Sequence, residues 1–152
     1  MRKRVVAYVA GMLFFLYTVS LFLISRNQNP YHVKMESTEA FCYVNRAETG
    51  NLHETSIVIT NHSNRTLSSQ LNINLSYHLY RIVGDTQELV SIENIRTTIP
   101  NIYPEDSTEV RLQFEVPIEN GIYILYADLI EENVVWYSER GMRTPYITIE
   151  VH

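Results

Sequence analysis

Four residues in the C-terminal third of the chain combine the side-chain types that bind sugars. Asp128, Glu131, Glu132 and Trp136 fall within nine consecutive positions. Carboxylates accept hydrogen bonds from hydroxyl groups, and an aromatic ring packs against the apolar face of a sugar ring. The cluster therefore predicts a sugar or cation site. The structural alternative is that Trp136 fills a hydrophobic core while the acids cap a turn.

Paired carboxylates also suggest glycoside hydrolysis. Glu131 and Glu132 are adjacent, however, and neighbouring residues of a strand point to opposite faces, so these two do not converge on one bond. Cys42 would need a histidine and an orienting group to act as a nucleophile, and no catalytic signature surrounds it. A small buried residue is the expected role of Cys42. We predict that the chain is not an enzyme and has no catalytic residues.

Two residues elsewhere in the chain complete the candidate site. Arg96 could clamp a carboxylate, a phosphate or a sugar hydroxyl, and its alternative role is an ion pair with one of the many acids. His78 is either a ligand-binding residue or a polar residue facing solvent. The candidate ligand-binding residues are Trp136, Asp128, Glu132, Tyr137, Arg96 and His78.

The five histidines lie at positions 32, 53, 62, 78 and 152, without any H-x-H or H-x-x-x-H pair. A zinc site needs three or four ligands close together, and this spacing of the histidines does not bring any such set together. The single cysteine excludes an intramolecular disulfide and a cysteine-rich metal site. We therefore predict no metal and no cofactor.

The charge distribution argues against nucleic acid as a partner. The chain has 152 residues, and the segment after residue 30 carries all 17 acidic but only eight of the 12 basic residues, a formal charge of −9. A surface this acidic repels polyanions.

Residues 5–24 form a run of 20 positions without a charge (VVAYVAGMLFFLYTVSLFLI). A helix of that length spans roughly 30 Å, the thickness of the hydrocarbon core of a bilayer. The run is longer than the core of a secretory signal peptide, and no small-residue cleavage site follows it. We interpret it as an uncleaved signal anchor, with a cleaved signal peptide as the alternative.

Positive charges indicate the orientation of this segment. Arg2, Lys3 and Arg4 precede the run, and only Arg26 follows it closely. The positive-inside rule then predicts a cytoplasmic stub over 1–4, a single transmembrane segment over 5–24, a linker over 25–35 and an extracytoplasmic domain over 36–152. The expected location is the cell membrane, with the bilayer as a partner.

Beyond residue 30 the apolar residues recur with a period of two. In residues 108–116 (TEVRLQFEV) four apolar side chains alternate with charged or polar ones, and residues 70–82 (QLNINLSYHLYRI) show the same pattern. Such alternation is typical of half-buried strands. The expected strands are 41–44, 54–60, 70–82, 108–116, 122–130, 134–137 and 145–151. Seven or eight short strands separated by turn signals, with no helical pattern, predict an all-β, antiparallel β-sandwich.

The Gly121-Ile122-Tyr123 sequence at the start of one late strand predicts a tyrosine corner. In that motif the tyrosine hydroxyl bonds to the backbone a few residues upstream, across a Greek-key crossover. Tyr123 shares its face with Leu125 and Leu129, which places it toward the interior.

Three blocks of sequence together resemble an Ig-like β-sandwich domain found beside or within bacterial glycosyltransferases and other surface-polysaccharide proteins. They are residues 75–78 (LSYH), 96–104 (RTTIPNIYP) and 121–141 (GIYILYADLIEENVVWYSERG). The chain contains no glycosyltransferase domain, so the resemblance implies an Ig-like fold and a glycan-linked setting at the bacterial cell surface, not a reaction.

These observations predict a non-catalytic, membrane-anchored extracytoplasmic Ig-like module that binds a glycan or supports assembly of a cell-surface polysaccharide. A polysaccharide-assembly membrane protein is then an expected partner. The alternative is an accessory subunit of a membrane protein complex, which recognises protein through an edge strand or through its transmembrane helix.

Overall fold

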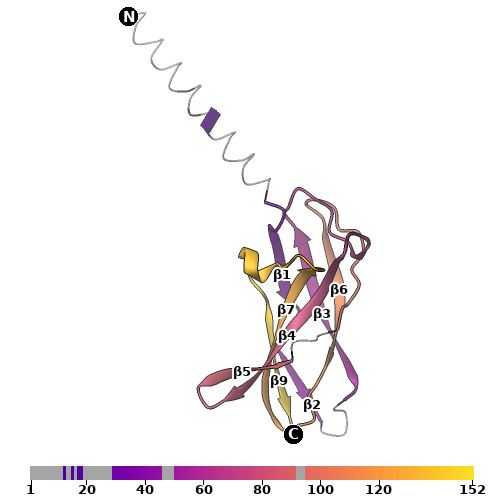
Figure 1. The fold of residues 1–152 in the computed structure, drawn as a ribbon, viewed down its shortest axis with the longest axis vertical. Coiled ribbons are helices and arrows are strands. Elements are labelled where there is room, and N and C mark those ends of the chain that lie inside the picture. The colour runs from indigo at the N-terminus through magenta and orange to yellow at the C-terminus, as the bar shows by residue number, and fades with distance from the viewer. Residues whose placement is uncertain (1–11, 13–14, 16, 19–28, 46–49, 92–94) are drawn as a thin grey trace, which may run out of the picture.

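The computed structural model describes residues 12, 15, 17, 18, 29–45, 50–91 and 95–152. In this part of the chain nine β-strands and two short 3-10 helices form a β-sandwich of two sheets (Figure 1). The predicted all-β sandwich is confirmed. Within the described residues, no helix is long and apolar enough to cross a membrane. The stub over 1–4 and most of the segment over 5–24 lie outside the described residues, so the signal anchor stays a prediction.

The smaller sheet has three antiparallel strands in the order β1-β3-β6. They are β1 (Val33–Ser37), β3 (Leu52–Asn61) and β6 (Ser107–Glu115). In β6 the alternation read from the sequence is observed directly, because Val110, Leu112 and Phe114 are buried while the residues between them are more exposed.

The larger sheet has six strands. Five lie in the order β2-β9-β7-β4-β5, and β8 pairs with β7. They are β2 (Phe41–Val44), β4 (Ile73–Val83), β5 (Thr86–Ser91), β7 (Gly121–Glu131), β8 (Val135–Trp136) and β9 (Tyr146–Val151). All pairs are antiparallel except β2 with β9, which is parallel.

The hydrophobic core lies between the two sheets. β4 contributes Ile73, Leu75, Tyr77 and Leu79, as its alternation predicts. Leu71, which the sequence placed on the same face, is 55% exposed instead. It belongs to the 3-10 helix η2 (Ser69–Leu71), where the Ser68 hydroxyl accepts a hydrogen bond from the Gln70 amide and Asn72 adopts a left-handed conformation. The strand therefore begins at Ile73, three residues later than expected.

The tyrosine corner is present. Tyr123 is buried, and its hydroxyl donates a hydrogen bond to the backbone oxygen of Glu119 at 2.8 Å. This contact ties the loop between β6 and β7 to the start of β7, as it does at Greek-key crossovers in Ig-like sandwiches.

Two strands, β1 and β5, were not predicted from the sequence. β1 covers only five residues and begins at Val33, within the segment expected to be a linker. Residues 86–90 of β5 are all exposed, so no buried face generates an alternating pattern there. The hairpin of β4 and β5 projects from the side of the sandwich (Figure 1).

Candidate functional site

Five of the six predicted site residues meet on the outer face of the six-stranded sheet. Strand alternation turns Leu75 and Tyr77 of β4 inward and Ser76 and His78 outward. Ser76 is paired with Asp128 of β7 across the ladder, so Asp128 also lies on the outer face. In β8, Trp136 is paired with Ile130 of β7, which brings the indole close to His78 and Asp128. We call Trp136, Arg96, His78, Asp128 and Glu132 the outer-face cluster.

Trp136 is half-buried on this outer face and does not fill the core. The His78 ring lies against it, with ring centroids 4.2 Å apart and an angle of 52° between the planes. The Arg96 guanidinium carbon lies 5.2 Å from the centroid of the indole. A cation over an indole face is attracted by the quadrupole of the ring, so both neighbours fix the orientation of Trp136.

Asp128 is completely buried and holds the base of the cluster. One carboxylate oxygen, Oδ2, lies 3.2 Å from His78 Nε2, and the other, Oδ1, accepts a hydrogen bond from the Ser138 amide at 3.2 Å. The turn after β8 is thereby tied to β7, as the structural alternative predicted for the acids. Asp128 positions His78 and the hairpin rather than presenting a carboxylate to solvent.

Arg96 and Glu132 form an ion pair above the sheet. Arg96 Nε donates to Glu132 Oε1 at 2.9 Å, and Nη1 donates to the Ser76 hydroxyl at 3.0 Å. Asn74 donates to the same glutamate oxygen at 3.1 Å. The ion-pair role considered for Arg96 is therefore observed, and it also places the guanidinium over Trp136.

Two polar groups of the outer-face cluster are left for a ligand. Among the described residues, none donates a hydrogen bond to Glu132 Oε2, and none accepts one from the indole N–H of Trp136. The cluster thus combines a half-exposed indole, one acceptor and one donor, all within a small area. Side chains of this kind match the hydroxyl groups and apolar faces of a sugar.

Tyr137 does not join this cluster, which corrects its inclusion among the ligand-binding residues. It is fully buried on the opposite side of the hairpin, because neighbouring residues point to opposite faces. Its hydroxyl accepts a hydrogen bond from Arg65 Nη2 at 2.7 Å, and its ring packs edge-on against Tyr31 with centroids 5.0 Å apart. The pKa of the Tyr137 phenol is raised to about 12. Burial raises it most, and the nearby Arg65 guanidinium acts in the opposite direction.

The same alternation separates the two adjacent glutamates. Glu131 lies beside Tyr137. Its two carboxylate oxygens accept hydrogen bonds from Nη1 and Nη2 of Arg65, at 3.1 and 2.5 Å. The hydrogen bond to Glu131 raises the pKa of Arg65 above its already high value. The expectation that Glu131 and Glu132 do not converge is confirmed. Arg65 was missed, because no local signal in the sequence pairs it with Glu131, 66 positions away.

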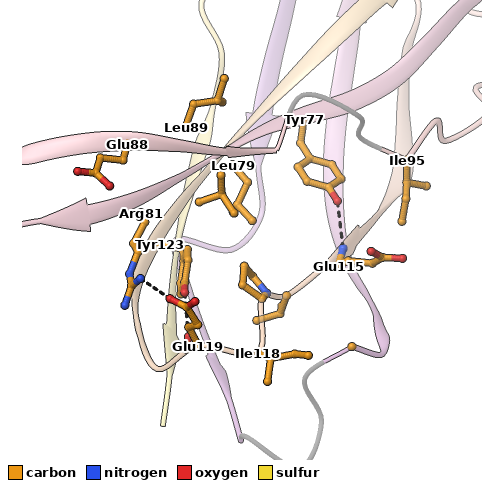
Figure 2. A pocket seen from close by; sticks show the side chains of 14 residues that line it. Tyr77, Leu79, Arg81, Glu88, Leu89, Ile95, Glu115, Ile118, Glu119 and Tyr123 are labelled. Atoms are coloured by element: carbon orange, nitrogen blue, oxygen red, sulfur yellow. Dashed lines mark hydrogen bonds and ion pairs between the residues drawn. The ribbon is translucent and has the colours of Figure 1, made fainter.

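A cavity of about 610 Å³ lies on the inner face of β4, along Tyr77, Leu79 and Arg81 (Figure 2). It opens between the inner side of the β4–β5 hairpin and the segment from Glu115 to Glu119 that leads toward β7. Leu79, Ile95 and Ile118 contribute apolar walls, and the ion pair of Arg81 with Glu119 lies at its rim. Sequence reasoning missed this cavity, because part of its wall comes from β5, which has no alternating pattern in the sequence.

The described part of the chain brings together no group of three or more His, Cys, Asp or Glu side chains that could hold a metal ion. The absence of a metal and of a cofactor remains a prediction. Cys42 is half-buried in β2 and packs against the core.

No family model matches the sequence, and no curated protein matches it. Among solved structures, the CARDB domain of a Pyrococcus furiosus protein, determined by NMR, is 15% identical and covers 78% of this chain and 93% of that chain, with a TM-score of 0.45. A crystal structure of that domain in complex with di-metal ions is 14% identical, with coverages of 78% and 91% and a TM-score of 0.42.

A β-glucosidase from Listeria innocua in complex with laminaribiose is 12% identical, covers 80% of this chain and 16% of that chain, and has a TM-score of 0.46. The identities of these solved structures to this chain lie between 12% and 15%, and their TM-scores are below 0.5. At such identities the likeness concerns the fold alone.

Proposed function

We propose that this chain is a non-catalytic Ig-like module that binds a glycan through its outer-face cluster. The observation that carries the proposal is the position of Trp136. The only tryptophan of the chain lies half-exposed on a sheet surface, with a donor of its own and an unused acceptor beside it.

The chemistry of the cluster suits a sugar ring. The apolar face of the ring would pack on the exposed part of the indole, and its hydroxyls would bond to Glu132 Oε2 and to the indole N–H. Arg96 and His78 already hold the indole in place through contacts of 5.2 and 4.2 Å. A ligand therefore does not need to order these side chains, and less of the binding free energy is lost to entropy.

A membrane anchor over residues 5–24 would strengthen weak binding. In this proposal the anchor confines the domain to a thin layer at the outer face of the cell membrane, where surface polysaccharides are assembled. Confinement raises the effective concentration of the domain toward any glycan held in the same layer. Modest contacts at Trp136 are then sufficient, and an accessory role in polysaccharide assembly follows.

The direct test is binding of the full chain to a panel of immobilised bacterial surface polysaccharides. We expect at least one polysaccharide to retain the chain. Trp136→Ala should weaken that binding about threefold to tenfold, because an aromatic contact contributes roughly 0.5–1.5 kcal/mol. Glu132→Gln should weaken it by a similar factor, since it removes a charged acceptor.

Val134→Ala is the matched control, because Val134 lies in the same hairpin, is 63% exposed and has no part in the cluster. Its binding should equal that of the unmodified chain. Retention of no polysaccharide, or equal binding by the Trp136→Ala and Val134→Ala variants, would contradict the proposal.

A further inference from the structure

The cavity on the inner side of the β4–β5 hairpin has the size and lining of a binding site. Its volume of about 610 Å³ falls in the range of roughly 300–1,000 Å³ that is usual for ligand pockets. Leu79, which is itself buried, lines the cavity from β4, and Ile118, which is 66% exposed, faces it from the opposite wall (Figure 2). An apolar side chain placed between these two residues would be removed from water on both sides.

One border of the cavity is an open sheet edge. β5 ends the six-stranded sheet, and among the described residues its only strand partner is β4. In an antiparallel sheet alternate residues direct both N–H and C=O to the same neighbour, so half of the residues of β5 present these groups outward. An open edge of this kind is a template for an added strand.

The charges around the cavity are predominantly acidic. Arg81 is paired with Glu119 and also donates to the backbone oxygen of Asn120, so its charge is already balanced. Glu88 of β5 and Glu115 at the end of β6 also line the cavity, and no described residue forms an ion pair with either. The site therefore favours a partner that brings positive charge together with an apolar group.

We propose that the β5 edge and this cavity bind an extended polypeptide segment in which one strand face carries an apolar residue between two basic residues. The segment adds to β5 as a further strand. Because successive side chains alternate between the two faces of a sheet, its apolar side chain enters between Leu79 and Ile118 and its basic side chains lie near Glu88 and Glu115. Backbone hydrogen bonds supply general affinity, and the cavity supplies selectivity.

This site is separate from the outer-face cluster. On β4 the cavity is lined by Tyr77, Leu79 and Arg81 on the inner face of the sheet, whereas His78 and the rest of the cluster lie on the outer face. The inference therefore does not depend on glycan binding, and either proposal could fail alone.

The test uses the full chain and a fluorescein-labelled heptapeptide in which threonine alternates with lysine, leucine and lysine. Fluorescence anisotropy measures its dissociation constant. A second peptide with glutamate in place of both lysines is the charge control. We expect the lysine peptide to bind more tightly than the glutamate peptide, and its affinity to fall as salt screens the exposed charges.

Two variants of the chain locate the site. Glu88→Gln should weaken binding of the lysine peptide about threefold, as for an exposed ion pair. Ile118→Ser removes an apolar wall and should weaken it by more. Val134→Ser is the matched control for Ile118→Ser, because Val134 has a similar exposure of 63% on another hairpin.

Peptides that are N-methylated at alternate residues test the strand pairing. Methylation of one set of alternate amides should abolish binding, and methylation of the other set should not, because only one set faces β5. Equal binding of both methylated peptides, or of the lysine and glutamate peptides, would overturn the proposal. Self-association of the chain would also overturn the proposal, if Ile118→Ser abolished this association and the peptide did not compete with it.

Discussion

Glu131 and Glu132 are adjacent, and each joins an arginine and an aromatic side chain, yet the two clusters differ in how completely they are satisfied. Glu131 receives two hydrogen bonds from Arg65, which also donates to the fully buried Tyr137. Glu132 receives one hydrogen bond from Arg96, which lies over the half-exposed Trp136. The same residue types thus make a closed cluster on one face and an open one on the other.

The closed cluster joins distant parts of the chain. Tyr31, which precedes β1, packs on Tyr137 and lies near two guanidinium groups, with Arg65 at 5.3 Å and Arg140 at 5.6 Å from its ring centroid. Every one of these contacts is internal to the domain. The difference indicates that the Arg65 cluster stabilises the fold, whereas the Arg96 cluster has capacity for a ligand.

Removal of each arginine should separate the closed cluster from the open one most clearly. Arg65→Ala leaves Glu131 and the Tyr137 hydroxyl largely buried without their partner, and we expect it to lower the free energy of unfolding by about 2–3 kcal/mol. Arg96→Ala should lower it by about 1 kcal/mol or less, because that ion pair is more exposed to water. Chemical denaturation of the full chain measures both values.

Arg111→Ala is the control for these variants. Arg111 has a side chain that is 78% exposed and pairs with Glu54 at 3.6 Å, so its removal should change stability by less than about 0.5 kcal/mol. If Arg65→Ala and Arg96→Ala destabilised the chain equally, the division into a closed and an open cluster would be wrong.

Alkaline pH provides a second test of the closed cluster. Because the pKa of Tyr137 is raised to about 12 in the folded chain, the folded state keeps a proton that the unfolded state releases near pH 10. The stability associated with this proton is fully present below pH 10 and is lost as the pH rises from about 10 to 12.

Over that range the unmodified chain should lose about 2–3 kcal/mol more than Tyr137→Phe, as measured by denaturation at a series of pH values. Burial also raises the pKa values of Tyr77 and Tyr123, but both remain in the two proteins and their contribution cancels. An identical pH dependence of the two proteins would show that Tyr137 is not held neutral by the closed cluster.

The sequence predicted the sandwich well where strands bury one face. β4, β6 and β7 alternate clearly, since their inner residues form the core. It failed for β5, whose residues 86–90 are exposed on both faces and so have no reason to alternate. Burial on one face is the source of the pattern, and a strand without it leaves no periodic signal.

Most residues of the candidate site could also be predicted from their proximity in the sequence. The face of the sheet on which their side chains lie could not. Asp128, Glu132 and Trp136 are close along the chain, whereas the approach of His78 depends on the long-range register that pairs β4 with β7. The choice between Trp136 and Tyr137 for the core depends on a single residue of register in β8, where a shift by one position exchanges the two faces. Residue types alone do not determine that register.

A glycan site at Trp136 is best tested by acrylamide quenching of tryptophan fluorescence in the full chain, with and without a polysaccharide that binds the chain. The signal has a single source, because Trp136 is the only tryptophan. We expect an emission that acrylamide quenches in the free chain and that the bound polysaccharide shifts and protects. A shielded emission in the free chain, or quenching that no bound polysaccharide alters, would contradict a glycan site at Trp136.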